Sequence, residues 1–323
     1  MIPNKAERKV DKDDIRRLSN REKLHNLTLK HSAKRRLINK LVTIFAISSV
    51  IIAIIPLGSI LIEVVRNGIS VISIEFLTKP PGSFYLGNGG IAPAIQGTLI
   101  VVGLASLIGA PIGVLSGIYL SEYASSDSSG GGRISSKKVL FSYAVRLFND
   151  VLAGVPSIVI GIVGYVMIVL IIGSFSVLAG AFALSIIMIP IVVRVTEETL
   201  KIVPDSIREA GHSLGIPKWK ITLFIVLRGA KSGVLTGIVL AIARIAGETA
   251  PLIMTILGTS LFFSSYTGPV DALPLRIWRL ASQPYESAHA FGWGAALVLI
   301  LIVLGLSISL RLLAHEKRIF SSA

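Results

Sequence analysis

Apolar residues in this chain of 323 residues gather in long runs separated by polar segments. The runs are about twenty residues long, enough for a helix to cross a hydrocarbon core roughly 30 Å thick. Continuous apolar runs favour helices, whereas a membrane barrel shows short segments of alternating polarity. We therefore predict an all-α integral membrane protein with six transmembrane helices. The predicted spans are 41–63, 93–120, 151–172, 176–195, 230–257 and 291–313.

Composition supports this class and narrows the chemistry. Hydrophobic residues make up 52% of the chain and charged residues only 15%, which is unusual for a soluble domain. There is no cysteine, so disulfides and thiolate metal sites are excluded. The five histidines show no metal-ligand spacing, and we predict no metal site.

The net charge of +14 is unevenly distributed along the chain. Residues 1–40 hold 13 of the 32 Lys and Arg residues, directly before the first apolar run. This pattern keeps an N-terminus in the cytosol and indicates interaction with anionic lipid rather than with nucleic acid. When the spans alternate from there, the inside segments 121–150, 196–229 and 314–323 carry eleven Lys and Arg residues, and the outside segments carry four. We predict that both termini are cytosolic.

The chain is accordingly divided into five predicted parts. They are a basic, mobile cytosolic tail (1–40), a first transmembrane helix (41–63), an outer loop (64–92), a core with five transmembrane helices (93–315) and a cytosolic C-terminal end (316–323). Within the core, Ser and Gly enrichment predicts a flexible loop over 121–138.

A charged segment, 204–228, predicts a helical elbow on the cytosolic side. Ser206 and Glu209 have capping-box spacing, so a short helix should begin there and stop at Gly215. Pro217 should open a second helix. Three hydrophobic residues near the turn are candidates to fill a groove on a partner protein. They are Leu214, Ile216 and Trp219. An ordinary cytosolic loop, with Glu209 serving only as a cap, is the competing interpretation.

The sequence ARIAGETAPL places Arg244 and Glu248 inside the fifth apolar run. Residues four apart share one helix face, and a charge at mid-bilayer costs about 2.5–3.5 kcal/mol on insertion scales. The two residues should therefore pair and face a helical bundle or an aqueous path. One interpretation is a structural pair that neutralises itself. The other is an anion path, in which the arginine attracts an oxyanion and the glutamate accepts a proton from phosphate that sulfate lacks.

Other polar residues in the spans have two interpretations each. Arg194 snorkels to the cytosolic interface or lies along the anion path, to which we also assign Thr249. Gln96 and Thr98 line the outer opening of the path or bond to a neighbouring helix. Asn149 and Asp150 should cap the third span. The glycines of the spans, Gly103, Gly109, Gly113 and Gly117 among them, predict close helix packing.

No nucleotide-binding loop of the GxxxxGK[ST] type and no HExxH or serine-nucleophile motif occurs in the chain. We therefore predict that the chain is not an enzyme and binds no cofactor. If nucleotide powers this protein, a separate subunit must bind it.

The elbow resembles the EAA loop of ABC-importer permeases, EAA-x3-G-x9-I-x-LP. The matching residues are Glu209, Ala210, Gly215, Ile225 and Leu227, and the departures are Gly211 for the second alanine and Arg228 for the proline. Gly211 should weaken the helix by up to about 1 kcal/mol, and Arg228 leaves open whether the chain bends on leaving the loop. The resemblance implies a coupling helix, to which Glu209, Ala210, Gly211, Gly215, Ile225 and Leu227 contribute, docked on an ATPase subunit.

Three further stretches resemble one subfamily, the PstA type of permease from phosphate-specific ABC importers. They are GGIAPAIQGTL (89–99), NDVLAGVPSIVIG (149–161) and ARIAGETAPL (243–252). The resemblance covers about residues 41–315 and implies the MetI-like permease fold in a prokaryotic plasma membrane. It also implies a second related permease, two ATPase subunits that hold ATP and Mg²⁺, and an external phosphate-binding protein.

Three alternatives stay open at this point. A permease for molybdate or sulfate is the nearest alternative, although GETAP counts against it. An ion-coupled secondary transporter would not need the elbow, and no inverted repeat is visible. A membrane scaffold without transport would leave the intramembrane charges unexplained.

Overall fold

The computed structural model describes residues 5–82, 89–124 and 136–315, and these parts of the chain are almost entirely helical. Among the described residues, the β-structure consists of two isolated bridges, Pro81 with Gly89 and Leu257 with Val270. The α-helices are α1 (Lys5–Gly68), α2 (Ile74–Thr78), α3 (Ala92–Ile118), α4 (Ser136–Gly154), α5 (Ser157–Gly164), α6 (Leu170–Ile172), α7 (Val177–Lys201), α8 (Asp205–Ser213), α9 (Lys218–Lys220), α10 (Leu227–Ala246), α11 (Ala250–Thr255), α12 (Leu273–Ala281) and α13 (Glu286–His315). Three π-helical turns are η2 (Tyr119–Tyr123), η4 (Tyr165–Val169) and η5 (Ile221–Val226).

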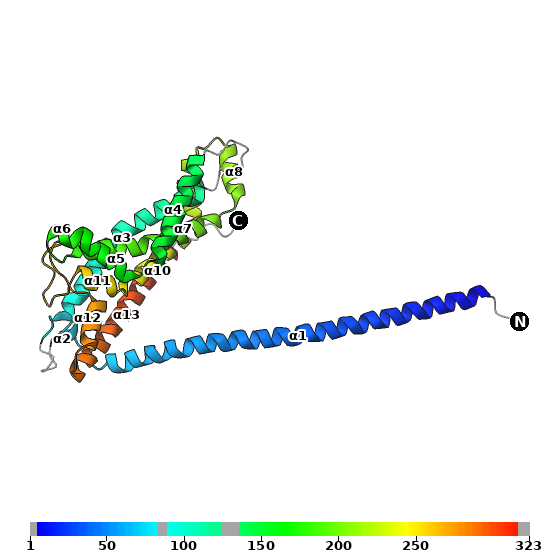
Figure 1. Ribbon diagram of the computed structural model, residues 1–323, viewed down its shortest axis with the longest axis horizontal. Coiled ribbons are helices and arrows are strands. Elements are labelled where there is room, and N and C mark those ends of the chain that lie inside the picture. The colour runs from blue at the N-terminus through cyan, green and yellow to red at the C-terminus, as the bar shows by residue number, and fades with distance from the viewer. Residues whose placement is uncertain (1–4, 83–88, 125–135, 316–323) are drawn as a thin grey trace. The chain divides into compact units, whose positions relative to one another are not determined.

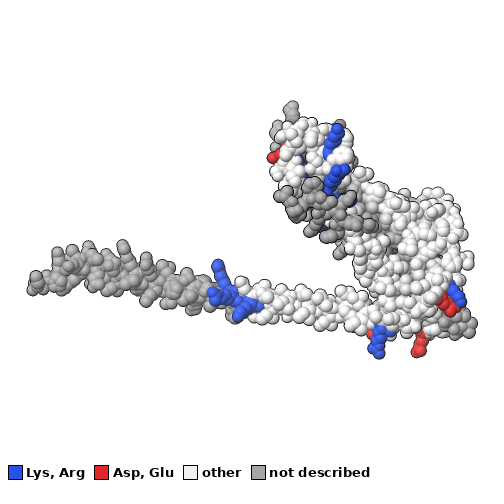
Figure 2. All heavy atoms as spheres, turned by 180° about the vertical axis from the view of Figure 1, so that it is seen from behind, with Lys and Arg blue, Asp and Glu red and all other residues white. Residues whose placement is uncertain are grey.

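The chain forms two compact units, Met1–Glu63 and Val64–Ala323. The first contains most of α1, and the second contains all the other helices. In the described chain, five helices are long and apolar enough to cross a membrane, or six when the bent pair α4–α5 counts as one span. On the face of the second unit shown in Figure 2, charged side chains gather at its two ends, with a broad band almost without charge between them. This distribution is what a bilayer requires, and the predicted all-α membrane class is confirmed.

The centre of the second unit is the packing of α3 against α7 (Figure 1). Gly109, Gly113 and Gly117 lie one turn apart on α3 and face α7. A Cβ atom on Gly113 would lie 2.6 Å from the Cβ of Val192, and one on Gly117 would lie 2.6 Å from the Cβ of Thr196. These glycines therefore let the two helix backbones approach closely, as predicted. Gly103 has no heavy atom within 4 Å of the same position, so it has no part in this seam.

The third predicted span is bent. Leu140–Gly154 and Ser157–Ile172 meet at 103°, with Pro156 as the N-cap of α5. Proline has no N–H to continue the helix, and the residue before it avoids helical backbone, so the chain turns here. The expected cap at Asn149 and Asp150 is wrong, because both residues lie in the interior of α4.

The fifth predicted span, 230–257, is interrupted. Helix α10 ends at Ala246, with Gly247 as its C-cap, and the chain resumes as the short helix α11 at Ala250. Helix α11 packs against α5, where a Cβ atom on Gly161 would lie 2.7 Å from the Cα of Pro251. The break places Glu248 and Thr249 in a non-helical junction between two helices.

The segment between α11 and α13 is tied to the bundle by polar contacts. Asp271 is fully buried, and its carboxylate forms an ion pair with the guanidinium of Arg276, which also donates to the Thr259 carbonyl at 3.1 Å. Burial raises the pKa of Asp271 above its ordinary value, against the opposing effect of Arg276. The side chain of Arg276 is itself only 5% exposed, so this ion pair lies in the packed interior.

Two polar residues of α3 also bond to this segment. The Thr98 hydroxyl accepts from the Leu273 N–H at 2.8 Å, and the Gln96 carbonyl oxygen accepts from the Phe263 N–H at 3.0 Å. Of the two interpretations left open for Gln96 and Thr98, the structure supports the packing contact.

Candidate functional site

The predicted elbow is a helix, a sharp turn and a second helix. Helix α8 spans Asp205–Ser213, Gly215 adopts φ +73°, and Pro217 is the N-cap of the following helix. A left-handed φ is accessible to glycine because glycine has no Cβ, which explains why the helix stops at Gly215. The predicted capping box is wrong, because Pro204 is the N-cap and Ser206 lies inside the first turn.

The motif residues of the elbow divide into an outer and an inner set. Glu209 and Ala210 are exposed, and so are Leu214 and Trp219 at the turn. Three other motif residues face inwards: Gly211 is buried, and Ile225 and Leu227 pack against a hydrophobic cluster around Ile221. The elbow thus presents one free surface and packs the other on the helical body.

Gly211 has a packing role that its helix propensity does not suggest. A Cβ atom at this position would lie 2.9 Å from the Cδ1 of Ile221, which is itself only 1% exposed. Alanine would therefore require either the Ile221 side chain or α8 itself to shift. At the other departure from the motif, Arg228, the chain runs from η5 into α10 without a break, and the guanidinium carbon lies 5.6 Å from the centre of the Phe224 ring.

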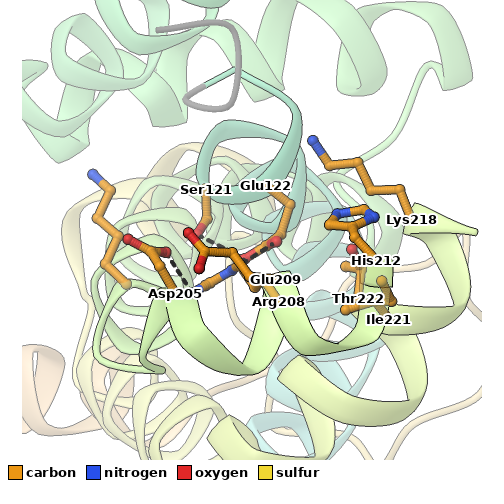
Figure 3. A pocket seen from close by; sticks show the side chains of 10 residues that line it. Ser121, Glu122, Asp205, Arg208, Glu209, His212, Lys218, Ile221 and Thr222 are labelled. Carbon is orange, nitrogen blue, oxygen red and sulfur yellow. Dashed lines mark hydrogen bonds and ion pairs between the residues drawn. The ribbon is translucent and has the colours of Figure 1, made fainter. Parts of the chain in front are cut away.

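A half-open cavity of 480 Å³ lies beside α8, next to its contacts with the helices beneath it (Figure 3). Its lining comes from α8, from the end of α7, and from η2, α9 and η5, and it includes Glu122, Arg208, Glu209, His212 and Thr222. The hydroxyl oxygen of Thr222 is buried, with no hydrogen-bond partner among the described residues. Helix α8 is therefore not packed on the helical body along its whole length.

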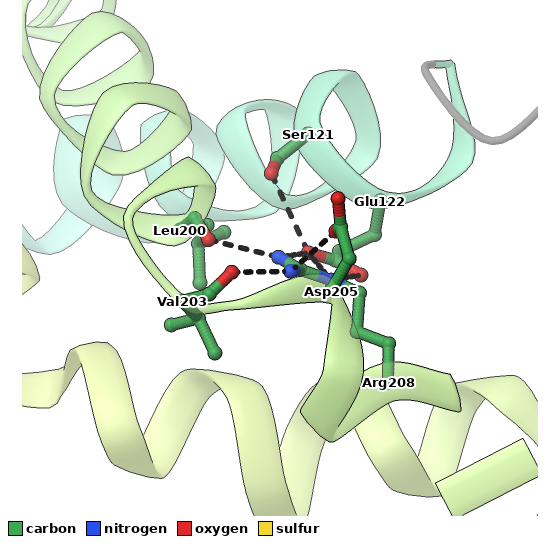
Figure 4. A network of polar contacts seen from close by, with 6 residues as sticks. All are labelled: Ser121, Glu122, Leu200, Val203, Asp205 and Arg208. Carbon is green, nitrogen blue, oxygen red and sulfur yellow. Dashed lines mark hydrogen bonds and ion pairs between the residues drawn. The ribbon is translucent and has the colours of Figure 1, made fainter. Parts of the chain in front are cut away.

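The structure adds Arg208 and Glu122 to the elbow (Figure 4). The Nη2 atom of Arg208 lies 2.7 Å from the Oε1 atom of Glu122, whose side chain is only 4% exposed. The hydrogen bond to Glu122 raises the pKa of Arg208 above its ordinary value, so the guanidinium stays charged. The predicted flexible loop over 121–138 is therefore wrong at its start, where Ser121 and Glu122 are buried in η2. Residues 136–138 belong to α4, and 125–135 lie outside the described residues.

The second predicted site lies at the end of α10 remote from the elbow. The Arg244 guanidinium forms an ion pair with the Glu248 carboxylate, as the four-residue spacing predicted. The two ends of this pair differ in exposure: the side chain of Glu248 is 7% exposed and that of Arg244 is 60% exposed. The carboxylate is thus fixed in the helical body, while the guanidinium points out from this subunit.

The remaining path residues are not brought into this pair by any described contact. Thr249 follows Glu248 directly and is the N-cap of α11. Arg194 lies on α7, where its Nε atom is 3.1 Å from the Oε1 atom of Glu198, and both side chains are mostly exposed. Such an exposed pair contributes about 0–1 kcal/mol, so it does not fix Arg194 in place.

A helical membrane bundle with an exposed helical elbow and a charged pair at a helix break defines a transport permease. The chain belongs to the family of binding-protein-dependent transport system inner membrane components, whose sequence model matches residues 128–320.

Relatives narrow the family further. The chain is 37% identical to the phosphate transport system permease protein PstA of Yersinia pestis over 90% of this chain and 94% of that protein. It is 40% identical to the protein of the same name from Haemophilus influenzae, over 88% of this chain and 96% of that protein.

A solved structure supports the fold. The bacterial alginate ABC transporter in complex with a pentasaccharide-bound periplasmic protein contains a chain that superposes with a TM-score of 0.60. That likeness covers 85% of this chain and 94% of the other at 15% identity, so it bears on the fold alone. The predicted ABC-importer permease fold is confirmed, and the protein is a multi-pass membrane protein.

Proposed function

We propose that this chain is the transmembrane permease subunit of an ATP-driven importer for inorganic phosphate. Membership of the permease family and the similarity to two proteins named as phosphate permeases support this function. The single observation that carries the proposal is the unequal exposure of the Arg244–Glu248 pair. A pair that only neutralised itself would have no reason to expose its cation from the bundle while burying its anion.

The chemistry of the pair suits hydrogen phosphate. Arg244 offers N–H donors to the anion oxygens, and an arginine fork matches oxyanion geometry well. Glu248 lies beside it as a fixed acceptor for the O–H of a protonated phosphate. Sulfate at neutral pH has no such proton and would leave the carboxylate facing an anion, so the site would reject it. Thr249 and Arg194 are the further residues that we assign to the path.

The assembly follows from the charge pattern and the elbow. The excess of Lys and Arg supports a cytosolic location for both termini and the elbow. Two ATPase subunits there would hold ATP and Mg²⁺ and contact the elbows through α8, with Glu209 and Ala210 exposed on it. Gly211, Gly215, Ile225 and Leu227 would hold the shape of that elbow. A second, related permease would complete the path against the exposed Arg244, and an external binding protein would deliver phosphate.

The test is phosphate uptake by proteoliposomes that contain the complete importer with its binding protein. We expect Glu248→Gln to keep ATP-dependent uptake measurable but to reduce the exclusion of sulfate, because the carboxylate that opposes sulfate is gone. Arg244→Gln should lower phosphate uptake strongly, since removing one donor that faces an anion in a specific site costs a factor of about 10²–10³ in enzymes. Glu75→Gln is the control, because it removes an exposed ion pair with Lys79 on α2.

Several results would contradict the proposal. Unchanged uptake and unchanged sulfate exclusion in Glu248→Gln would show that the pair is only structural. Better competition by molybdate or sulfate than by phosphate in the unaltered protein would assign another oxyanion. Uptake that follows an ion gradient and resists vanadate would assign a secondary transporter.

A further inference from the structure

Helix α8 meets the helical body at distinct contacts, with a cavity beside them. Helix α8 follows α7 through the short link at Ile202–Pro204, and the 480 Å³ cavity lies beside α8. Gly211 touches Ile221 on η5 at one end of α8. A displacement of α8 can reach the spanning helices through such contacts and through the link itself.

Arg208 joins α8 to the helical body with a set of directed bonds (Figure 4). Towards η2, at the end of α3, its Nη2 and Nε atoms donate to the Glu122 carboxylate at 2.7 and 3.2 Å. Towards the end of α7, Nη2 donates to the Leu200 carbonyl at 2.8 Å and Nη1 to the Val203 carbonyl at 2.6 Å. One side chain on α8 thereby holds the ends of two long helices.

The burial of this network makes it stiff. Glu122 is 4% and Arg208 18% exposed at the side chain, so water competes little for their bonds. A buried charge pair is costly to separate, because the attraction between its partners no longer offsets the desolvation of both charges. The second acid partner, Asp205, lies 3.1 Å from Nη1 but is 89% exposed, so it adds little.

Arginine is the side chain that this arrangement requires. Its planar guanidinium has five N–H donors in a fixed fork, whereas the lysine ammonium has three on a flexible stem. A lysine cannot serve the carboxylate and both carbonyls in one geometry. The Leu200 carbonyl lies in the last turn of α7 and the Val203 carbonyl just beyond it, where a cation is also favoured by the helix dipole.

We infer that Arg208 is a positioning residue that transmits the displacement of α8 to the ends of α3 and α7, and so couples ATP hydrolysis to opening of the path. This inference rests on the proposed function, because it assumes that an ATPase subunit moves α8. Arg208 need not contact phosphate or nucleotide. It acts by keeping α8 and the ends of α3 and α7 in one rigid unit while the ATPase subunit displaces α8.

The experiment measures phosphate imported per ATP hydrolysed by the complete importer in proteoliposomes. We expect Arg208→Gln and Glu122→Gln to retain ATP hydrolysis but to lower this ratio roughly tenfold, within the range typical of coupling between protein sites. Arg208→Lys should fall between Arg208→Gln and the unaltered protein. Asp205→Asn should lower the ratio much less than Glu122→Gln, and Lys79→Gln, which breaks an exposed pair on α2, serves as the distant control.

A cross-link gives a second readout that does not depend on the ion pair. The chain has no cysteine, so Arg208→Cys combined with Glu122→Cys introduces the only two thiols of this subunit. We expect a bifunctional thiol reagent to restore the import ratio in this double variant and not in either single variant. A merely structural role for Arg208 would predict that hydrolysis and import fall together and that thermal stability falls with them.

The outcomes distinguish a failure of this inference from a failure of the proposed function. If the unaltered importer shows ATP-dependent phosphate uptake but Arg208→Gln keeps its import ratio, the inference is wrong and the proposed function stands. The inference is also wrong if the cross-linked variant stays uncoupled while its thermal stability is normal. Absence of ATP-dependent phosphate uptake in the unaltered importer would overturn both.

Discussion

The α3–α7 seam allows a matched test of packing, because α3 carries glycines in two different surroundings. At Gly113 a Cβ atom would lie 2.6 Å from the Cβ and 2.8 Å from the Cγ1 of Val192. Carbon atoms are at their optimum about 3.5–4.0 Å apart, so Gly113→Ala requires the helices to separate by about 1 Å. At Gly103 there is no heavy atom within 4 Å, so the same substitution adds a methyl group into open space.

Two effects of opposite sign set the change in the free energy of unfolding. Alanine in place of glycine favours a helix by up to about 1 kcal/mol at either position. Overpacking a tight contact costs about 1–3 kcal/mol, and only Gly113→Ala incurs this cost. The Gly113→Ala variant should therefore be about 1–3 kcal/mol less stable than Gly103→Ala, which corresponds to about 2–4 °C in the unfolding midpoint per kcal/mol.

The assay heats the two purified variants in the same detergent to a series of temperatures. Size-exclusion chromatography then measures the fraction of each variant that remains folded, which gives the unfolding midpoint. Adding Val192→Ala to Gly113→Ala should recover part of the loss, because it removes the Cγ1 atom that lies 2.8 Å away. Equal midpoints for Gly113→Ala and Gly103→Ala would refute the close approach of α3 and α7 at this point.

Two further predictions concern the buried pair and the turn of the elbow. Arg276→Met should destabilise the protein by about 3–5 kcal/mol at neutral pH, because it leaves the buried Asp271 carboxylate without its cation. Burial already raises the pKa of Asp271 above 3.8 in the folded state. The loss of Arg276 raises that pKa further, so the stability deficit should shrink as the pH falls and the carboxyl takes up a proton. Unfolding midpoints at pH 7.5 and pH 5 would show this, and a deficit that grows in acid would contradict it. At the elbow, Gly215→Val should cost about 1–2 kcal/mol because φ is +73°, whereas Gly215→Asn should cost less. Since a Cβ atom at Gly215 has no neighbour within 4 Å, equal effects of both changes would show that backbone strain is not the cause.

The sequence determined the membrane class, the elbow and the Arg244–Glu248 pair, because each depends on residues close together in the chain. Apolar run length decides whether a helix can cross lipid, and the proline and glycine at the turn restrict their own backbone. Arg244 and Glu248 are only four positions apart, so their side chains lie within reach of each other, although α10 ends at Ala246 and they do not share one helix as predicted.

Only the tertiary structure decided which residues meet across long separations. Glu122 follows an apolar run and precedes a Ser- and Gly-rich stretch, and its local sequence indicated a loop. Its partner Arg208 is 86 positions away, so their burial together depends on how α3 and α8 are placed. The same holds for Gly113, which faces α7, whereas Gly103 has no heavy atom within 4 Å of its Cβ position. It also holds for Gly211, which packs against Ile221. Local propensity is a property of short segments, whereas burial and pairing depend on neighbours that the fold supplies.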